Sequence, residues 1–227
     1  MKRATLAVAV FGLALVQALV PGAGRAQAAA PGELKLDVTR WHVVERESGP
    51  VNYYQVVNDP SMPFIHAQYV PPTATTVLGV EIGEGDRKRA REVGWQWRAV
   101  TLPKGGNECE DGKGDSAAVV YLTWKQTLKW YTLKYVWSTV GPRGAVCDRK
   151  RNPFVAQDTV ILESGGPVGV WRTERIDLRQ EFRKHFADGN PNADVPDFVG
   201  VGIMTDGDQT KSESSADYAA FVLEHVP

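Results

Sequence analysis

Apolar and polar residues alternate along most of this chain in short runs, separated by glycine, proline, asparagine and aspartate. That pattern is typical of β-strands joined by tight turns. The predicted strands are Val51–Val57, Thr75–Ile82, Trp95–Leu102, Ala117–Trp124, Tyr131–Ser138, Thr159–Glu163, Gly169–Ile176, Val199–Thr205 and Tyr218–His225. Only Leu178–Phe186 has a helical pattern, and Asp177 is placed to cap its free amide groups. Many short strands with one helix predict an all-β fold, an antiparallel β-sandwich, and we favour a jelly roll.

The first 28 residues predict a secretory signal peptide. Two basic residues open the segment, an apolar run follows, and Ala26-Gln27-Ala28 offers small side chains at the positions that a signal peptidase reads. The apolar run is shorter than the roughly 20 residues that a membrane-spanning helix needs. We therefore expect a periplasmic or secreted protein, with a single β-sandwich domain over residues 33–227.

The charge balance limits the classes of partner. The chain has 26 basic and 27 acidic residues, and Lys2, Arg3 and Arg25 would leave with the signal peptide. The remaining chain would carry 23 basic residues against 27 acidic ones, a net charge of −4. This balance argues against nucleic acid or an anionic membrane as the main partner. We expect a monomer without membrane attachment after signal cleavage.

Two cysteines, Cys109 and Cys147, flank a predicted hairpin formed by Ala117–Trp124 and Tyr131–Ser138. The hairpin would bring both cysteines to the same end of the sheet. Export would also place them in an oxidising compartment, so we predict a disulfide. Two separate buried thiols are the alternative.

The pair Trp95 and Trp97 is the most conspicuous candidate for ligand contact. Side chains alternate across a strand, so both indole rings face the same way. They could stack on sugar rings, or they could fill the core, because each aromatic side chain buries a large apolar area.

A second candidate is the charged segment that contains Arg172, Glu174 and Arg175. Arg172 and Glu174 share one face of the predicted strand, and Arg175 lies on the other face. Charges in the middle of a strand must be exposed, paired or directed into a polar groove, because burying one alone is costly. The segment therefore predicts either cross-strand ion pairs or hydrogen bonds to a polar ligand.

Asp206 and Asp208 follow a predicted strand in the sequence Asp-Gly-Asp-Gln-Thr. Oxygen-bearing side chains at alternate positions resemble the way in which calcium loops present their ligands. However, Lys211 stands where the helical calcium loop needs glycine, and Asp-Gly is also a good hairpin turn. A structural calcium ion and a plain turn both remain open, and we expect no other cofactor.

Signatures of catalysis are scarce. The four histidines are scattered without metal-ligand spacing, and no serine stands in a nucleophile-elbow motif. Glu174 paired with Asp206 or Asp208 could serve glycoside hydrolysis if the two carboxylates faced each other. We therefore predict no catalytic residues and keep a glycan hydrolase as an alternative.

Five segments, in their order along the chain, resemble an uncharacterised family of exported bacterial proteins, the domain-of-unknown-function 3047 family. The segments are Trp95–Arg98 with Leu102-Pro103, Asp115–Tyr121, Leu133–Ser138, Trp171–Arg175 and Gly202–Thr210. The resemblance extends roughly from Val38 to the C-terminus. No activity is established for that family, but its pattern is similar to galactose-binding-like jelly rolls, the architecture of many carbohydrate-binding modules. The resemblance thus implies the same β-sandwich and, by analogy of fold, carbohydrate binding.

Together these observations predict an exported β-sandwich that binds a glycan or another polar ligand of the cell envelope. The predicted ligand-binding residues are Trp95, Trp97, Arg172, Glu174, Arg175, Asp206 and Asp208. The tryptophans would stack on the ligand or frame it from the core, the charged residues would hydrogen-bond to it, and the aspartates would order the rim. A module that docks another exported protein is the second alternative beside the hydrolase.

Overall fold

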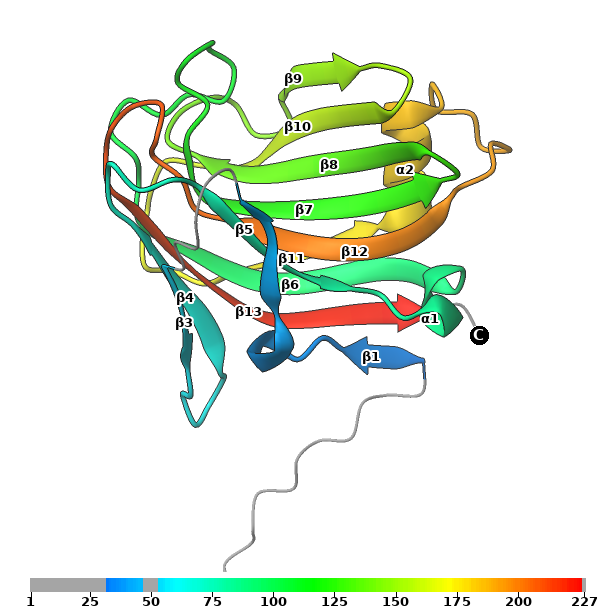
Figure 1. The fold of residues 1–227 in the computed structure, drawn as a ribbon, viewed down its shortest axis with the longest axis horizontal. Helices are drawn as coiled ribbons and strands as arrows, with labels where there is room; N and C mark the ends of the chain where they lie inside the picture. The colour runs from blue at the N-terminus through cyan, green and yellow to red at the C-terminus, as the bar shows by residue number, and fades with distance from the viewer. Residues whose placement is uncertain (1–31, 47–52, 226–227) are drawn as a thin grey trace, which may run out of the picture.

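The computed structural model describes residues 32–46 and 53–225. The predicted signal peptide, and the beginning of the predicted strand Val51–Val57, lie outside these residues. The described chain folds into two β-sheets that pack face to face (Figure 1).

The first sheet is antiparallel throughout, and its strand order is β11-β6-β13-β4-β3, with β1 paired to the far end of β13. Its strands are β1 (Glu33–Lys35), β3 (Tyr54–Val57), β4 (Phe64–Tyr69), β6 (Ala90–Thr101), β11 (Arg172–Asp177) and β13 (Ser214–His225). Trp97 of β6 lies opposite Tyr218 of β13, and both side chains point into the core.

The second sheet has the order β2-β5-β12-β7-β8-β10-β9. Its strands are β2 (His42–Arg46), β5 (Thr76–Glu81), β7 (Ser116–Gln126), β8 (Lys129–Ser138), β9 (Val146–Arg151), β10 (Val155–Ser164) and β12 (Asp197–Met204). β7 and β8 form the predicted hairpin. After β8 the chain crosses to the outer strand β9 and returns as β10, so β8 and β10 are parallel. This one parallel pair is the departure from an antiparallel sandwich.

Three short helices complete the described structure: η1 (Val38–Arg40), α1 (Glu84–Arg87) and α2 (Leu178–Phe186). The helix α2 has the bounds that the sequence predicts. The Asp177 carboxylate accepts hydrogen bonds from the backbone N–H groups of Arg179 and Gln180, at 3.0 and 2.9 Å, so its predicted role as a cap is confirmed. Phe182 of α2 packs against Trp124 and Tyr131, which fixes the helix on the sandwich.

The all-β sandwich predicted from the sequence is confirmed, but several strands were not predicted. Phe64–Tyr69 (β4) alternates, but its inward positions include the small Ala67, which weakens the apolar signal. Val146–Arg151 (β9) is an outer strand that is mostly charged, so its apolar pattern is nearly absent. Such a strand forms because the edge of β10 offers backbone N–H and C=O groups with which it can pair. The residues of the segment itself do not predict this pairing.

The core between the sheets is rich in aromatic rings. Trp95 and Trp97 lie edge to face at 5.7 Å, and Trp97 meets Trp137 of the opposite sheet at 5.9 Å. Phe221 of β13 stacks on Trp95. Burial of these large rings is the main source of stability for the sandwich.

Cys109 and Cys147 form a disulfide, with their Cα atoms 5.0 Å apart, which confirms the predicted pairing. The bond ties the connection between β6 and β7 to the start of β9. Disulfides are typical of proteins that work in oxidising compartments. Within the described residues, no helix is long and apolar enough to span a membrane.

Candidate functional site

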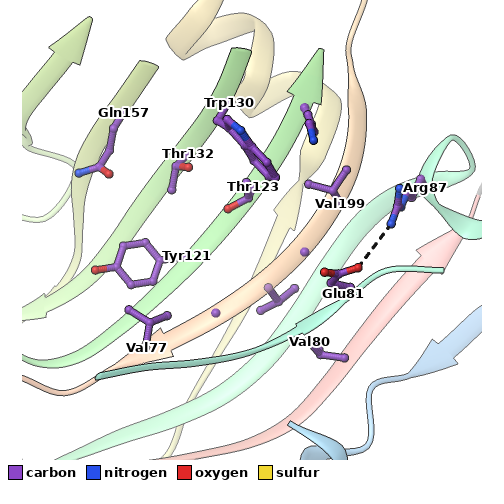
Figure 2. Close-up of a pocket in the computed structure, with 14 residues that line it drawn as sticks. Val77, Val80, Glu81, Arg87, Tyr121, Thr123, Trp130, Thr132, Gln157 and Val199 are labelled. Atoms are coloured by element: carbon purple, nitrogen blue, oxygen red, sulfur yellow. Dashed lines mark ion pairs between the residues drawn. The ribbon is translucent and has the colours of Figure 1, made fainter. Parts of the chain in front are cut away.

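A groove of about 790 Å³ crosses the outer face of the second sheet (Figure 2). Five neighbouring strands contribute to it: β5, β12, β7, β8 and β10. The lining residues are Val77, Val80, Glu81, Arg87, Tyr121, Thr123, Lys125, Trp130, Thr132, Gln157 and Val199–Gly202. Because the groove is broad and open along a sheet, it suits an extended ligand better than a small enclosed one.

Aromatic surface in the groove comes from Trp130 and Tyr121. Trp130 is 41% exposed, and the Lys125 ammonium lies 4.4 Å from the centroid of its ring. Tyr121 is partly buried, and its hydroxyl lies 3.5 Å from the Met204 sulfur. The exposed part of the Trp130 ring is a flat apolar surface on which a ligand could pack.

Alternation along the hairpin places these groups outside. Tyr131 and Leu133 of β8 point into the sandwich, so the alternate residues Trp130 and Thr132 point outward. In the same way, Leu122 and Trp124 of β7 are core residues, and the neighbouring Tyr121, Thr123 and Lys125 line the groove.

Two glycines of β12 keep the floor of the groove low. A Cβ atom at Gly202 would lie 3.2 Å from Val77 Cγ1 and 3.5 Å from Tyr121 Cδ2. A Cβ atom at Gly200 would lie 3.2 Å from the Val80 carbonyl oxygen. Neither glycine has a positive φ, so close approach, and not backbone conformation, explains the absence of a side chain here.

Several polar side chains in the groove are not engaged within the protein. Thr123, Thr132 and Gln157 make no side-chain hydrogen bond to another residue in the part of the chain that the structure describes. At one end, Glu81 and Arg87 approach each other to 3.8 Å (Figure 2). The groove therefore offers hydrogen-bonding groups beside an aromatic surface.

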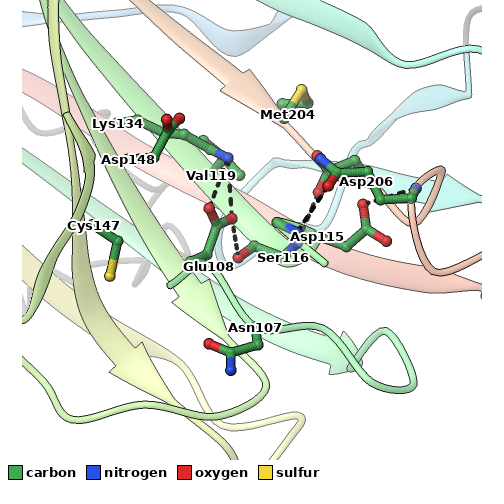
Figure 3. A network of polar contacts seen from close by, with 12 residues as sticks. Asn107, Glu108, Asp115, Ser116, Val119, Lys134, Cys147, Asp148, Met204 and Asp206 are labelled. Carbon is green, nitrogen blue, oxygen red and sulfur yellow. Dashed lines mark hydrogen bonds and ion pairs between the residues drawn. The ribbon is translucent and has the colours of Figure 1, made fainter. Parts of the chain in front are cut away.

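A second cavity, of about 520 Å³, continues from the groove and shares Val77, Tyr121 and Gln157 with it. Its wall contains a buried ion pair in which Lys134 Nζ lies 3.0 and 3.1 Å from the two carboxylate oxygens of Glu108 (Figure 3). The Ser116 hydroxyl donates to the same carboxylate at 2.7 Å. The pair is fully hydrogen-bonded, as burial of charge requires.

Asp206 lies beside this ion pair and accepts a hydrogen bond from the backbone N–H of Ser116 at 2.8 Å. Burial raises the pKa of Asp206 to about 8, with the Lys134 charge acting in the opposite direction and the Glu108 charge adding to the rise. Burial and the neighbouring Asp115 also raise the pKa of Asp208. The second cavity, at this end of the groove, therefore holds two carboxyl groups whose pKa values are raised, so they lose their protons at a higher pH than a free aspartate.

The predicted calcium loop brings three carboxylates together. One oxygen each of Asp115, Asp206 and Asp208 lies within 4.8 Å of the others. Asp115 also accepts hydrogen bonds from the Thr210 backbone N–H and hydroxyl, at 2.7 and 2.6 Å, which orders the turn without an ion. The residue types fit a hard cation such as calcium, and calcium binding stays a prediction.

The predicted tryptophans are core residues. Trp95 and Trp97 are 1% and 0% exposed, so neither ring is available for stacking on a ligand. Of the two interpretations offered by the sequence, the structure selects the core. The stacking role assigned to Trp95 and Trp97 is therefore corrected, because the face of β6 that carries them is covered by the second sheet.

The three charged residues of β11 that were predicted to bind a ligand do not lie on the same face of the strand. Glu174 points inward, accepts a hydrogen bond from Trp97 Nε1 at 3.2 Å, and has a pKa raised by burial and by the Glu163 charge. Arg172 shares its face of the strand, whereas Arg175 points outward.

On that outer face, Arg175 Nη1 lies 2.6 Å from Glu92 and 2.5 Å from Glu224. Arg175 thus forms the cross-strand ion pairs that were one of the two sequence interpretations. The carboxylate whose charge raises the pKa of Glu174 is Glu163. Asp206, which the sequence paired with Glu174, lies instead beside Ser116 in the second cavity.

Sequence reasoning missed the residues that form the groove. Neither Trp130 nor Tyr121 is among the residues predicted from the sequence to contact a ligand. A signal was present, because inward Tyr131 and Leu133 require outward neighbours on both sides, and one of those neighbours is a tryptophan. The groove itself could not be read from the sequence, since its walls come from five strands.

Comparison with solved structures finds distant sandwiches. The family 11 carbohydrate-binding module of the cellulase Lic26A-Cel5E of Clostridium thermocellum is 9% identical, with coverage of 87% of this chain and 97% of that chain, and a TM-score of 0.45. The xyloglucanase domain of NopAA of Sinorhizobium fredii, solved with cellobiose, is 11% identical, with coverage of 87% and 99% and a TM-score of 0.47. Endoglucanase 3 of Trichoderma harzianum, from family GH12, is 10% identical, with coverage of 74% and 80% and a TM-score of 0.39. At this distance no role of these proteins is transferred to the present chain.

A comparison with curated proteins finds no match. A comparison with protein families matches residues 39–222 to the family described as "Protein of unknown function (DUF3047)". The match covers most of the chain and confirms the resemblance noted in the sequence.

Proposed function

This chain belongs to the DUF3047 family of proteins of unknown function, and we propose its function from the geometry of the groove. The groove on the second sheet binds a carbohydrate chain. The observation that carries the proposal is the exposed Trp130 ring in a groove that crosses five strands, beside Thr123, Thr132 and Gln157, whose side chains have no hydrogen-bond partner among the described residues.

Sugars present both kinds of surface that the groove can match. The C–H face of a pyranose ring is apolar and packs on an indole ring, while its hydroxyl groups need donors and acceptors at the sides. Trp130 would supply the stacking surface, and Thr123, Thr132 and Gln157 would supply hydrogen bonds. An extended groove with a low glycine floor would accept several sugar units in a row.

The number and positions of the carboxylates near the groove favour binding of the glycan without its hydrolysis. Glycoside hydrolysis requires two carboxyl groups on opposite sides of the scissile bond. The groove lining contains one carboxylate, Glu81, and this residue faces Arg87. Asp206 and Asp208 lie in the neighbouring cavity, and Glu174 lies on the other sheet.

The same proposal includes the cellular setting expected from the sequence: a monomer in the periplasm or outside the cell. The Cys109–Cys147 disulfide supports an oxidising compartment. In that setting, the expected ligand is a glycan of the cell envelope or of the surroundings.

The test measures binding of the oxidised protein to soluble glycans by calorimetry, using cello-oligosaccharides, xyloglucan, galactomannan and peptidoglycan fragments. One class should bind, and Trp130→Ala should weaken that binding about tenfold, or about 1.4 kcal/mol, because the stacking surface is lost. Trp171→Ala is the matched control, since Trp171 packs against Phe64 and Arg98 on the first sheet and should leave affinity unchanged.

The alternative functions predict different results. If no glycan class binds, the groove is better explained as a docking surface for another exported protein. If a glycan binds and shortened products accumulate, the hydrolase interpretation replaces simple binding.

A further inference from the structure

A third cavity, of about 370 Å³, is lined by residues of α1, of α2 and of the segment that leads into β12. These elements lie at the same end of the sandwich (Figure 1). The lining of the cavity is Arg87, Lys88, Ala90, Trp124, Leu178, Arg179, Arg183 and Asp194–Phe198. Four basic side chains and two acidic ones, Asp194 and Asp197, therefore surround one small space, which we call the arginine pocket.

The three arginines of the arginine pocket are held in place by backbone carbonyl groups. Arg87 Nε donates to the Ile82 carbonyl at 2.7 Å, and Arg183 Nε donates to the Ala193 carbonyl at 3.1 Å. Arg179 Nη2 donates to the Lys88 carbonyl at 3.4 Å. Each guanidinium has five N–H groups, so most of its donors remain for other partners.

The arginines are also poorly neutralised. Within the described residues, neither Arg179 nor Arg183 forms an ion pair with a carboxylate, and Arg87 reaches only Glu81, at 3.8 Å. Asp194 and Asp197 line the same pocket, but neither forms an ion pair with a basic group of the described chain. The four basic side chains outnumber the two carboxylates of the lining, and guanidinium groups that are held in position without a close ion-pair partner can bind an oxyanion.

An independent observation comes from Trp124. Its side chain is 0% exposed, it lines the arginine pocket, and its indole N–H has no hydrogen-bond partner. A buried donor without an acceptor costs free energy, so a ligand acceptor would relieve that cost. The indole N–H groups of Trp41 and Trp95 are also unpartnered, but neither residue lines this pocket.

We propose that the arginine pocket binds an oxyanion, a phosphate or carboxylate group carried by a small molecule or by a glycan substituent. Arg179 and Arg183 hold the anion in paired hydrogen bonds, beside Trp124 in the lining of the pocket. Arg87 lines both this pocket and the groove, so an anionic substituent on a bound glycan chain could reach the pocket. The proposal itself stands on the pocket alone and does not require that the groove binds sugar.

The test is calorimetry on the full oxidised protein at low salt with four probes: inorganic phosphate, glucose 6-phosphate, glucuronate and glucose. The anionic probes should bind, and glucose should not bind at this pocket. The double substitution Arg179→Gln with Arg183→Gln should weaken the binding at least about tenfold, because hydrogen bonds to charged groups are the strong ones. The matched control is Arg40→Gln, which removes one exposed charge outside the pocket and should leave binding unchanged.

A second measurement follows Trp124 directly. The indole Nε1–H resonance of Trp124, assigned by its loss in Trp124→Phe, should shift on addition of phosphate. If Trp124→Phe does not fold, the same resonance can be assigned in the wild type from contacts with Phe182 and Phe198. Binding of phosphate without glucuronate, or the reverse, identifies which oxyanion the pocket selects, and either result supports the proposal.

Three results would overturn the proposal: none of the anionic probes binds, the double arginine variant binds as well as the wild type, or Arg40→Gln weakens binding as much as the double variant. The Trp130→Ala protein separates this proposal from the previous one. That variant should lose affinity for neutral glycans and keep its affinity for phosphate.

Discussion

The outer faces of the two sheets carry similar residue types but use them differently. On the first sheet, the buried Asp217 carboxylate meets Arg98 Nε at 2.6 Å and His66 Nδ1 at 2.6 Å. The Arg98 guanidinium lies 4.6 Å from the Trp171 ring centroid. Every charged group of this cluster has a partner within the protein.

The outer face of the second sheet leaves several polar groups of the groove unengaged. Trp130 is exposed, and the side chains of Thr123, Thr132 and Gln157 have no hydrogen-bond partner among the described residues. Groups that satisfy one another stabilise the fold, whereas unengaged groups beside an exposed ring are available to a ligand. The first face therefore has a structural role, and the second face is the one for which we propose binding.

The largest expected effect tests the structural role of the first face. Asp217→Ala should lower the free energy of unfolding by about 2 kcal/mol, because Arg98 and His66 lose their shared partner. Urea unfolding measures the loss. Affinity for the glycan should stay within twofold of the wild type, and a larger drop would move the binding site to the first face.

The next effect concerns Asp206, at the acidic end of the groove. Its pKa is about 8 in the folded protein and near 3.8 when unfolded, so the folded state keeps its proton over the range between these values. Folding stability should therefore fall as the pH rises from about 4 to about 8, by up to about 1.4 kcal/mol for each pH unit. Asp206→Asn should remove that part of the pH dependence in urea unfolding at pH 5 and pH 8. Parallel profiles for the two proteins would contradict the assignment.

Calcium should have a smaller effect at the same end of the groove. If the cluster of Asp115, Asp206 and Asp208 binds calcium, an ion concentration about ten times the dissociation constant should stabilise the protein by about 1.4 kcal/mol. Thermal unfolding with calcium and with chelator measures this at pH 8. Asp208→Asn should abolish the difference, and an unchanged midpoint in the wild type would leave the plain turn as the explanation.

The smallest effect tests the floor of the groove. Gly202→Ala would place a methyl group 3.2 Å from Val77 and 3.5 Å from Tyr121, so the floor would rise and these neighbours would shift. Glycan affinity should fall about fivefold, near 1 kcal/mol, while the unfolding free energy changes by about 1 kcal/mol or less. Thr173→Ala, at an exposed position of β11, serves as a control for a small substitution in a strand.

Local patterns predicted the elements that depend on neighbours in the chain. The helix Leu178–Phe186, its cap at Asp177 and the hairpin of β7 with β8 follow from periodicity and turn residues. The Cys109–Cys147 disulfide was predicted because the hairpin would bring both cysteines to one end of the sheet, and the structure confirms it over the alternative of two separate thiols. Of the residues predicted to bind a ligand, Trp95 and Trp97 form core, and the residues of the groove were not among those predicted.

The sequence by itself determined that the chain forms short alternating strands, one helix of nine residues and a linked cysteine pair. Only the tertiary structure decided which side of each strand is covered. Alternation with period two divides the residues of a strand between two faces, but burial depends on which sheet packs against them. This is why Trp97 lies inside while Trp130 lies in the groove, and why Arg172 and Arg175 are separated. The order of the strands is also decided by tertiary contacts. For example, β10 and not β9 lies next to β8, and no local sequence pattern predicts this.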